Sequence, residues 1–126
     1  MKIYFYIDST DLDDIAEPVA QAISDWLAST QQGKAQLVNR RPEDEDDAGQ
    51  ARVGEWDLGL LLETGKKADL KAPLAFLYDL ARQHECDFVV GIFDQQTGQP
   101  ENVCYFGHEE GRPELYEIAS YLGLKR

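Results

Sequence analysis

Two apolar runs joined by a polar turn decide the fold: FVVGIF at 88–93, DQQTG at 94–98 and NVCYF at 102–106. Both runs are rich in β-branched and aromatic residues, which favour strands. The turn between them contains a glycine and is short enough to connect neighbouring antiparallel strands. This stretch therefore predicts a β-hairpin.

Three further strands are predicted before the hairpin. Lys2–Ile7 alternates isoleucine and phenylalanine with tyrosine, so both faces are apolar and we expect it at the centre of a sheet. Lys34–Arg40 is expected to form a second strand. Residues 56–63 predict a third strand with one wholly apolar face, formed by Trp56, Leu58, Leu60 and Leu62. We expect the third strand to pair with the second.

Apolar residues at helical spacing predict three helices. The first runs on from Ile15, after a Ser9-Thr10-Asp11 start that offers capping oxygens. The second is expected over 70–81, where leucines form most of one face. The third is short and lies between a proline and a glycine, at 113–123.

Together these elements predict a single α+β domain over residues 1–126, in the order β-α-β-β-α-β-β-α. The length suits one domain with one hydrophobic core. The first six elements follow the split β-α-β plan of a ferredoxin-like core. The hairpin strand and the C-terminal helix are additions to that core.

Charge narrows the classes of partner. The chain has 12 basic and 24 acidic residues, a net charge of -12 and a pI near 4.4. Such a protein repels nucleic-acid phosphates and anionic membrane surfaces, so neither is an expected partner. The acidity serves either solubility alone or attraction of a basic protein.

The densest negative charge falls in a segment without any periodic pattern, at 42–54. We expect a mobile loop there, because five consecutive acids repel one another and cannot join a core. These acids are Glu43, Asp44, Glu45, Asp46 and Asp47.

A cytoplasmic location is expected from the sequence. Met1 and Lys2 lead straight into a strand-like run, which is unlike a signal peptide. No run approaches the roughly 18 apolar residues that a membrane span needs. Cys86 and Cys104 are too few to indicate a secreted disulfide framework, so we expect free thiols.

Two groups of residues carry types that could do chemistry. The first is the acids that follow the first strand, Asp8, Asp11, Asp13 and Asp14. Acids in that position can hold Mg²⁺, but they equally suit the start of a helix, which is the reading we favour.

The second group has the residue types that bind zinc or form a nucleophilic pair: His84, Cys86, Cys104 and His108. Their spacing does not match the closely spaced ligand pairs of structural zinc sites. Acids beside His108 also disfavour a thiolate. We therefore expect buried thiols, no metal, no cofactor and no catalytic residues.

A different role suits the stretch CYFGHEEGRPE at 104–114, which combines aromatic residues, glycines and acids between a strand and a helix. Aromatic and charged side chains on one loop are typical of a protein interface. A plain strand-to-helix connection accounts for the pattern equally well.

The C-terminal part of the chain also resembles a known class of protein. The runs DFVVGI at 87–92, NVCYFGHEEG at 102–111 and EIASYLGL at 117–124 are similar to small cytosolic immunity proteins that accompany bacterial polymorphic toxins. The resemblance implies a non-enzymatic inhibitor that protects its own cell by capping a toxin domain. Toxins that are nucleases have basic clefts, which would suit a strongly acidic inhibitor.

The leading hypothesis is thus an immunity-type inhibitor that binds a basic protein, such as a cognate toxin domain. Its expected contact residues are the five acids of 43–47, an aromatic anchor at Trp56 or Tyr105, and the group His108, Glu109, Glu110 and Glu114. The alternative is a small-ligand-binding or regulatory module that acts as a homodimer. A third hypothesis, a minor enzyme, rests on the acids between Asp8 and Asp14.

Overall fold

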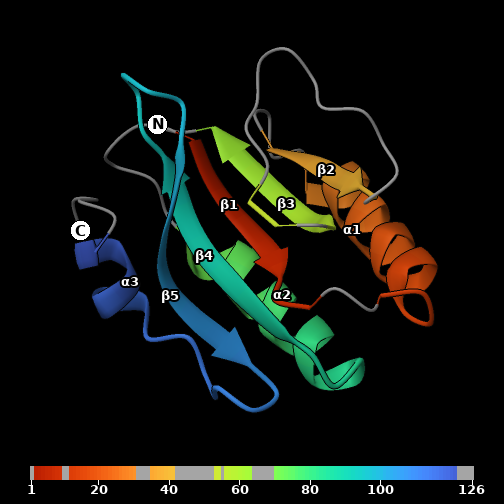
Figure 1. Cartoon of the computed structure of the whole chain (residues 1–126). Helices are drawn as coiled ribbons and strands as arrows, with labels where there is room; N and C mark the ends of the chain where they lie inside the picture. The colour runs from red at the N-terminus through yellow and green to blue at the C-terminus, as the bar shows by residue number, and fades with distance from the viewer. Residues whose placement is uncertain are drawn as a thin grey trace.

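A computed structural model describes residues 2–9, 12–30, 35–41, 53–54, 56–63 and 70–121. These residues form an α+β structure with one antiparallel sheet and three helices (Figure 1). The order of the elements along the chain is the predicted one. The acidic segment 43–47, and most of the loop expected at 42–54, lie outside the described residues.

The sheet has five strands, which are β1 (Lys2–Ile7), β2 (Ala35–Arg40), β3 (Asp57–Glu63), β4 (Asp87–Phe93) and β5 (Pro100–Gly107). They are arranged in the order β2-β3-β1-β4-β5, and every neighbouring pair is antiparallel. The strand with two apolar faces, β1, therefore lies in the middle, as its sequence predicts. The pairing of β2 with β3 is confirmed as well.

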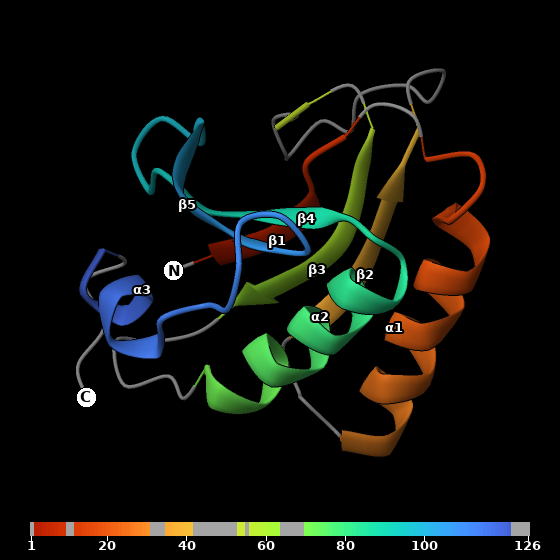
Figure 2. The same cartoon turned by 90° about the horizontal axis from the view of Figure 1, so that it is seen from below.

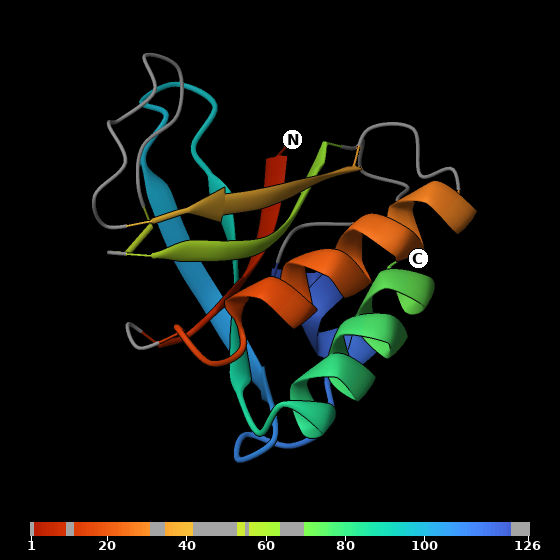
Figure 3. The ribbon, with the colours of Figure 1, turned by 90° about the vertical axis from the view of Figure 1, so that its right-hand side faces the viewer.

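The three helices are α1 (Ala16–Thr30), α2 (Lys71–Gln83) and α3 (Leu115–Tyr121). All three lie on the same side of the sheet (Figures 2 and 3). Side chains from these helices meet one face of the strands in the main core, which includes Ile23, Leu77, Phe5 and Phe88. Burial of this apolar surface is the main force that holds the helices to the sheet.

The opposite face of the sheet holds a second, smaller core of buried side chains: Tyr4, Tyr6, Leu61, Val89 and Phe93. The Tyr4 ring stacks on Tyr6 with 5.2 Å between centroids and meets Phe93 at 5.1 Å. Its hydroxyl donates to Asn102 Oδ1. Gly91 leaves the space for this, because a Cβ there would lie 2.1 Å from the Tyr4 hydroxyl oxygen.

The hairpin that decided the predicted fold is present and longer than expected. β5 begins at Pro100 rather than Asn102, and the β4–β5 register shifts between Val90 and Gly91. The shift places Val103 as an extra residue on β5, a bulge that increases local twist. The alternation of apolar residues alone does not reveal such a bulge.

The first helix begins one residue after Ile15, where its apolar pattern starts, but the predicted cap at Ser9 is wrong. α1 begins at Ala16, residues 13–15 form a turn, and Ser9 lies too far upstream to cap the helix. Leu12 precedes this turn: its side chain is fully buried and its carbonyl accepts from Ile15 N and Ala16 N. Thr10 and Asp11 lie outside the described residues.

Candidate functional site

The described candidates for partner binding do not share one environment. Trp56, expected as an exposed anchor, is only 6% exposed and packs in the main core. Its Nε1 donates to Asn39 Oδ1 at 2.8 Å, and the Arg41 guanidinium lies 4.9 Å from its ring. Tyr105 is 45% exposed on β5. Of the two expected anchors, only Tyr105 is therefore open to a partner.

The strongest local structure among the candidates is the segment 107–111, which we call the acidic turn. Gly107 and Gly111 exchange two backbone hydrogen bonds, each 2.9 Å long. The carboxylate of Asp87 accepts from the backbone N–H groups of Glu109 and Glu110, both at 3.0 Å to Oδ1. His108 N donates to the carbonyl of Cys86 at 3.0 Å.

Glycine is required where the chain enters the acidic turn. Gly107 has a φ of 145°, a conformation that other residues rarely adopt. A Cβ at this position would also lie 2.6 Å from Asp87 Cα and from the Cys86 carbonyl oxygen. The turn and the start of β4 thus approach so closely that no side chain fits between them.

The backbone of the acidic turn is ordered by hydrogen bonds, while its acidic side chains face solvent. His108, Glu109 and Glu110 are all exposed, although their backbone N–H groups are bonded to the β4 side of the sheet. A surface whose backbone is already ordered loses less conformational entropy on binding than a loose loop does. The acidic turn therefore presents exposed acidic side chains on an ordered backbone.

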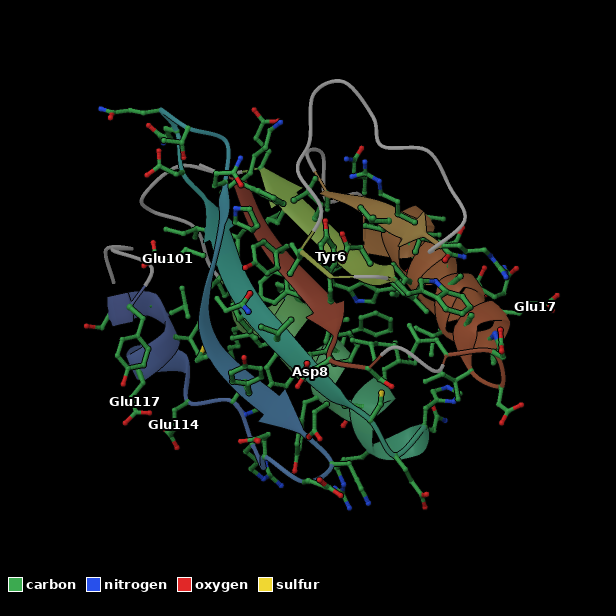
Figure 4. All side chains as sticks on the ribbon, viewed as in Figure 1. Tyr6, Asp8, Glu17, Glu101, Glu114 and Glu117 are labelled. Atoms are coloured by element: carbon green, nitrogen blue, oxygen red, sulfur yellow. The ribbon has the colours of Figure 1, made fainter. Side chains whose placement is uncertain are left out.

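Further acids continue this negative charge along β5 and α3. Glu101, Glu114 and Glu117 are exposed, and they lie on the side of the molecule formed by β5 and α3, whereas Glu17 projects from α1 on the other side (Figure 4). Tyr105 of β5 and Tyr121 of α3 are the exposed large hydrophobic side chains among the described residues. We call the surface of Glu101, Tyr105, Glu114, Glu117 and the acidic turn the acidic edge.

No protein family, curated protein or solved structure matches this chain.

The two cysteines lie behind the acidic edge as half-buried free thiols. Burial, and next to it the charge of Asp87, raises the pKa of Cys86 to about 11. Burial and the charge of Glu117 do the same for Cys104, also to about 11. Thiolates are the reactive form, so neither cysteine is activated as a nucleophile.

The histidines and the first acids do not assemble a metal site in the described part of the chain, where no group of three or more potential ligands converges. Asp8, Asp13 and Asp14 are exposed. The backbone of Asp8 continues the sheet, because its N–H donates to the Asp87 carbonyl at 2.8 Å. Among the described helices, none is long and apolar enough to cross a membrane.

The role of Asp87 in the acidic turn is not predicted by the sequence. Asp87 is the first residue of a strand-like run, yet its carboxylate orders the turn that displays Glu109 and Glu110. An aspartate 20 residues or more before a Gly-x-x-x-Gly segment is not a signal by itself. Only the pairing of β4 with β5 brings the two segments together.

Proposed function

We propose that this protein is an acidic binding protein of the immunity type, which neutralises a basic protein partner, such as a toxin domain, through the acidic edge. The observation that carries the proposal is the ordered acidic turn at the end of β5. It presents two exposed carboxylates on a backbone that needs no further ordering. The resemblance of residues 87–124 to immunity proteins supports the same function.

The distribution of charge supports a basic partner. Residues 100–121 carry five acids, Glu101, Glu109, Glu110, Glu114 and Glu117, against one arginine, Arg112. A surface of one sign raises the rate of encounter with the opposite sign and fixes the orientation of docking. The half-exposed Tyr105 ring supplies the aromatic contact that interface centres favour.

The position of β5 in the sheet adds a second source of affinity. Within the described residues β5 is an edge strand, because β4 is the one strand that pairs with it there. Edge strands offer backbone groups to which another chain can add. We infer a ferredoxin-like core beneath this edge, which the central place of β1 between β3 and β4 supports. A cytoplasmic setting, without catalysis, metal or cofactor, completes the proposal.

The partner can be found and tested with paired charge variants. We would capture partners from the native cytoplasm with the wild-type chain and with the double variant Glu109→Gln/Glu110→Gln. The matched control is Asp13→Asn/Asp14→Asn, which removes the same charge from exposed acids before α1. We expect one basic protein to be retained by the wild type and the control and lost by the Glu109/Glu110 variant.

Association and dissociation rates with the purified partner then distinguish acids that contact it from acids that attract it at a distance. Loss of Glu109 and Glu110 should increase the dissociation rate, by about thirtyfold if each charged hydrogen bond in the contact contributes about 1 kcal/mol. Replacement of the five acids at 43–47 by serine should instead slow association and flatten its salt dependence. Rates that ignore both sets of changes would show that the acidity serves solubility alone.

A further inference from the structure

A groove of the opposite charge lies on the helical side of this acidic protein. It has a volume of about 410 Å³. It is lined by one stripe of α2 and by Arg112 and Pro113 from the connection between β5 and α3. We call it the α2 groove.

Two arginines converge on one aromatic ring in the α2 groove. The guanidinium of Arg82 lies 5.9 Å from the centroid of the Tyr78 ring, and that of Arg112 lies 5.5 Å from it. Such cation–π contacts orient a guanidinium without using its N–H donors. The donors of both arginines therefore stay available to an acceptor, in positions that the ring helps to hold.

The lining of the groove combines positive charge with apolar surface. Lys71 adds a third cation, and Asp79 is the one acid among the lining residues. Arg82 and Arg112 thus place two positive charges at the groove, in a chain whose overall charge is -12. Leu74, Ala75 and Pro113 supply apolar contact beside the Tyr78 ring. The groove and the acidic edge are formed by different residues. Arg112, which lines the groove, directly follows the acidic turn in the chain.

We propose that the α2 groove binds a small organic dianion, of the class of phosphate monoesters with an apolar or aromatic portion. A phosphate monoester carries close to two negative charges at pH 7 and presents three acceptor oxygens, which suit two forked guanidinium groups. The apolar portion would lie against Leu74, Pro113 and the Tyr78 ring. The volume falls within the range of small-molecule sites, roughly 300–1,000 Å³.

Small size and charge complementarity favour this ligand over an acidic peptide. The negative field of the whole chain opposes the approach of any anion, and a long acidic chain would lie against the exposed acids as well as the groove. A compact dianion stays within one Debye length of the cations, about 8 Å at physiological salt, where their attraction is least screened. The proposal does not depend on the function proposed for the acidic edge.

The test is titration of the full chain with phenyl phosphate, followed by chemical shifts of backbone amides and of the Tyr78 ring. Inorganic phosphate and phenol, added separately, measure the charged and the apolar parts of the ligand. We expect saturable binding of phenyl phosphate that is tighter than that of either part, with shifts confined to the groove. Arg82→Gln and Arg112→Gln should each weaken it about tenfold, the value of one charge-assisted hydrogen bond.

The matched control is Arg41→Gln, which removes the same charge and also an arginine–aromatic contact, at Trp56, outside the groove. It should change the affinity by less than about twofold, because exposed charges at a distance are screened. Absence of saturable binding, or equal weakening by Arg41→Gln, would overturn the proposal. So would tighter binding of tetraglutamate with the same arginine dependence, which would assign the groove to an acidic peptide. Circular dichroism checks that each variant is folded.

Discussion

The acidic edge and the α2 groove both include residues of one connection, 107–114, and they differ in what orders their charges. At the acidic turn, hydrogen bonds from the backbone to Asp87 and Cys86 hold the chain, and the charged side chains project freely. In the groove, the charged side chains themselves are positioned, because two arginines contact one tyrosine ring. The first region is ordered by its backbone and the second by its side chains.

This difference shows that net charge is a poor guide to the chemistry of a particular surface. A total of -12 predicts repulsion of every anion, yet the described chain contains a groove lined by three cations and one acid. Fields from distant charges are screened over about 10 Å at 0.1 M salt, so short-range geometry decides what a groove binds.

The largest effect on stability is expected from Gly107→Ala, which should disrupt the backbone conformation of the acidic turn. The positive φ and the overlap with Asp87 and the Cys86 carbonyl together should lower the free energy of unfolding by about 3 kcal/mol. Gly98→Ala is the control: its φ of 74° is also positive, but a Cβ there meets nothing within 4 Å. It should cost about 1 kcal/mol in denaturant unfolding. Equal losses would mean that close approach does not constrain the turn.

A smaller loss is expected from Asp87→Ala, which removes the acceptor of two backbone N–H groups. We expect unfolding to become easier by about 2 kcal/mol, less than two fully buried charged bonds would contribute. Asp94 accepts from Gln96 N and Thr97 N in the fully exposed β4–β5 turn, and these bonds lower its pKa. Asp94→Ala should therefore cost less. Partner binding should suffer only in the Asp87 variant.

Alkaline pH should lower the free energy of unfolding, because buried cysteines and tyrosines lose protons more readily in the unfolded chain. The pKa values of Cys86 and Cys104 are raised from 9.0 to about 11 in the folded chain, and those of Tyr4 and Tyr6 are raised by burial above 10.0. The folded state thus keeps protons that the unfolded state releases, so stability is full below pH 9 and declines as pH rises toward 11. Thermal melts across this range, with Cys86→Ala/Cys104→Ala as the comparison, should show a shallower decline in the variant.

The smallest effect is expected on the alkylation rate of a cysteine introduced into the α2 groove, which reports the electrostatic potential there. Ala75 lines the groove, whereas Ala72 is exposed on the same helix outside it. Neighbouring cations favour the thiolate, so Ala75→Cys should be alkylated by iodoacetamide at pH 8 about threefold faster than Ala72→Cys. Both should react faster than the natural thiols. The rates can be followed by mass spectrometry, and a slower reaction at Ala75 would show that the groove is not cationic in solution.

The sequence by itself determined the elements of this protein and their order, because each one carries a local signal. The alternation in Lys2–Ile7 and in 56–63, the leucine spacing of 70–81 and the 88–106 hairpin were all confirmed. A local signal failed before α1: the side chain of Ser9 suits a helix cap by residue type, but α1 begins at Ala16, after a turn at residues 13–15.

Tertiary structure alone decided which residues form the sites. Trp56 and Tyr105 are both aromatic residues that could anchor a partner, and only packing shows that the first is buried and the second exposed. Asp87 orders a turn more than 20 residues away, and the guanidinium groups of Arg82 and Arg112 both lie near the ring of Tyr78. Spacing along a chain predicts contacts within a helix or between paired residues of a hairpin. The Asp87 contacts also need the turn that follows β5 to fold back onto β4, and the Tyr78 contacts need Arg112 to lie beside α2.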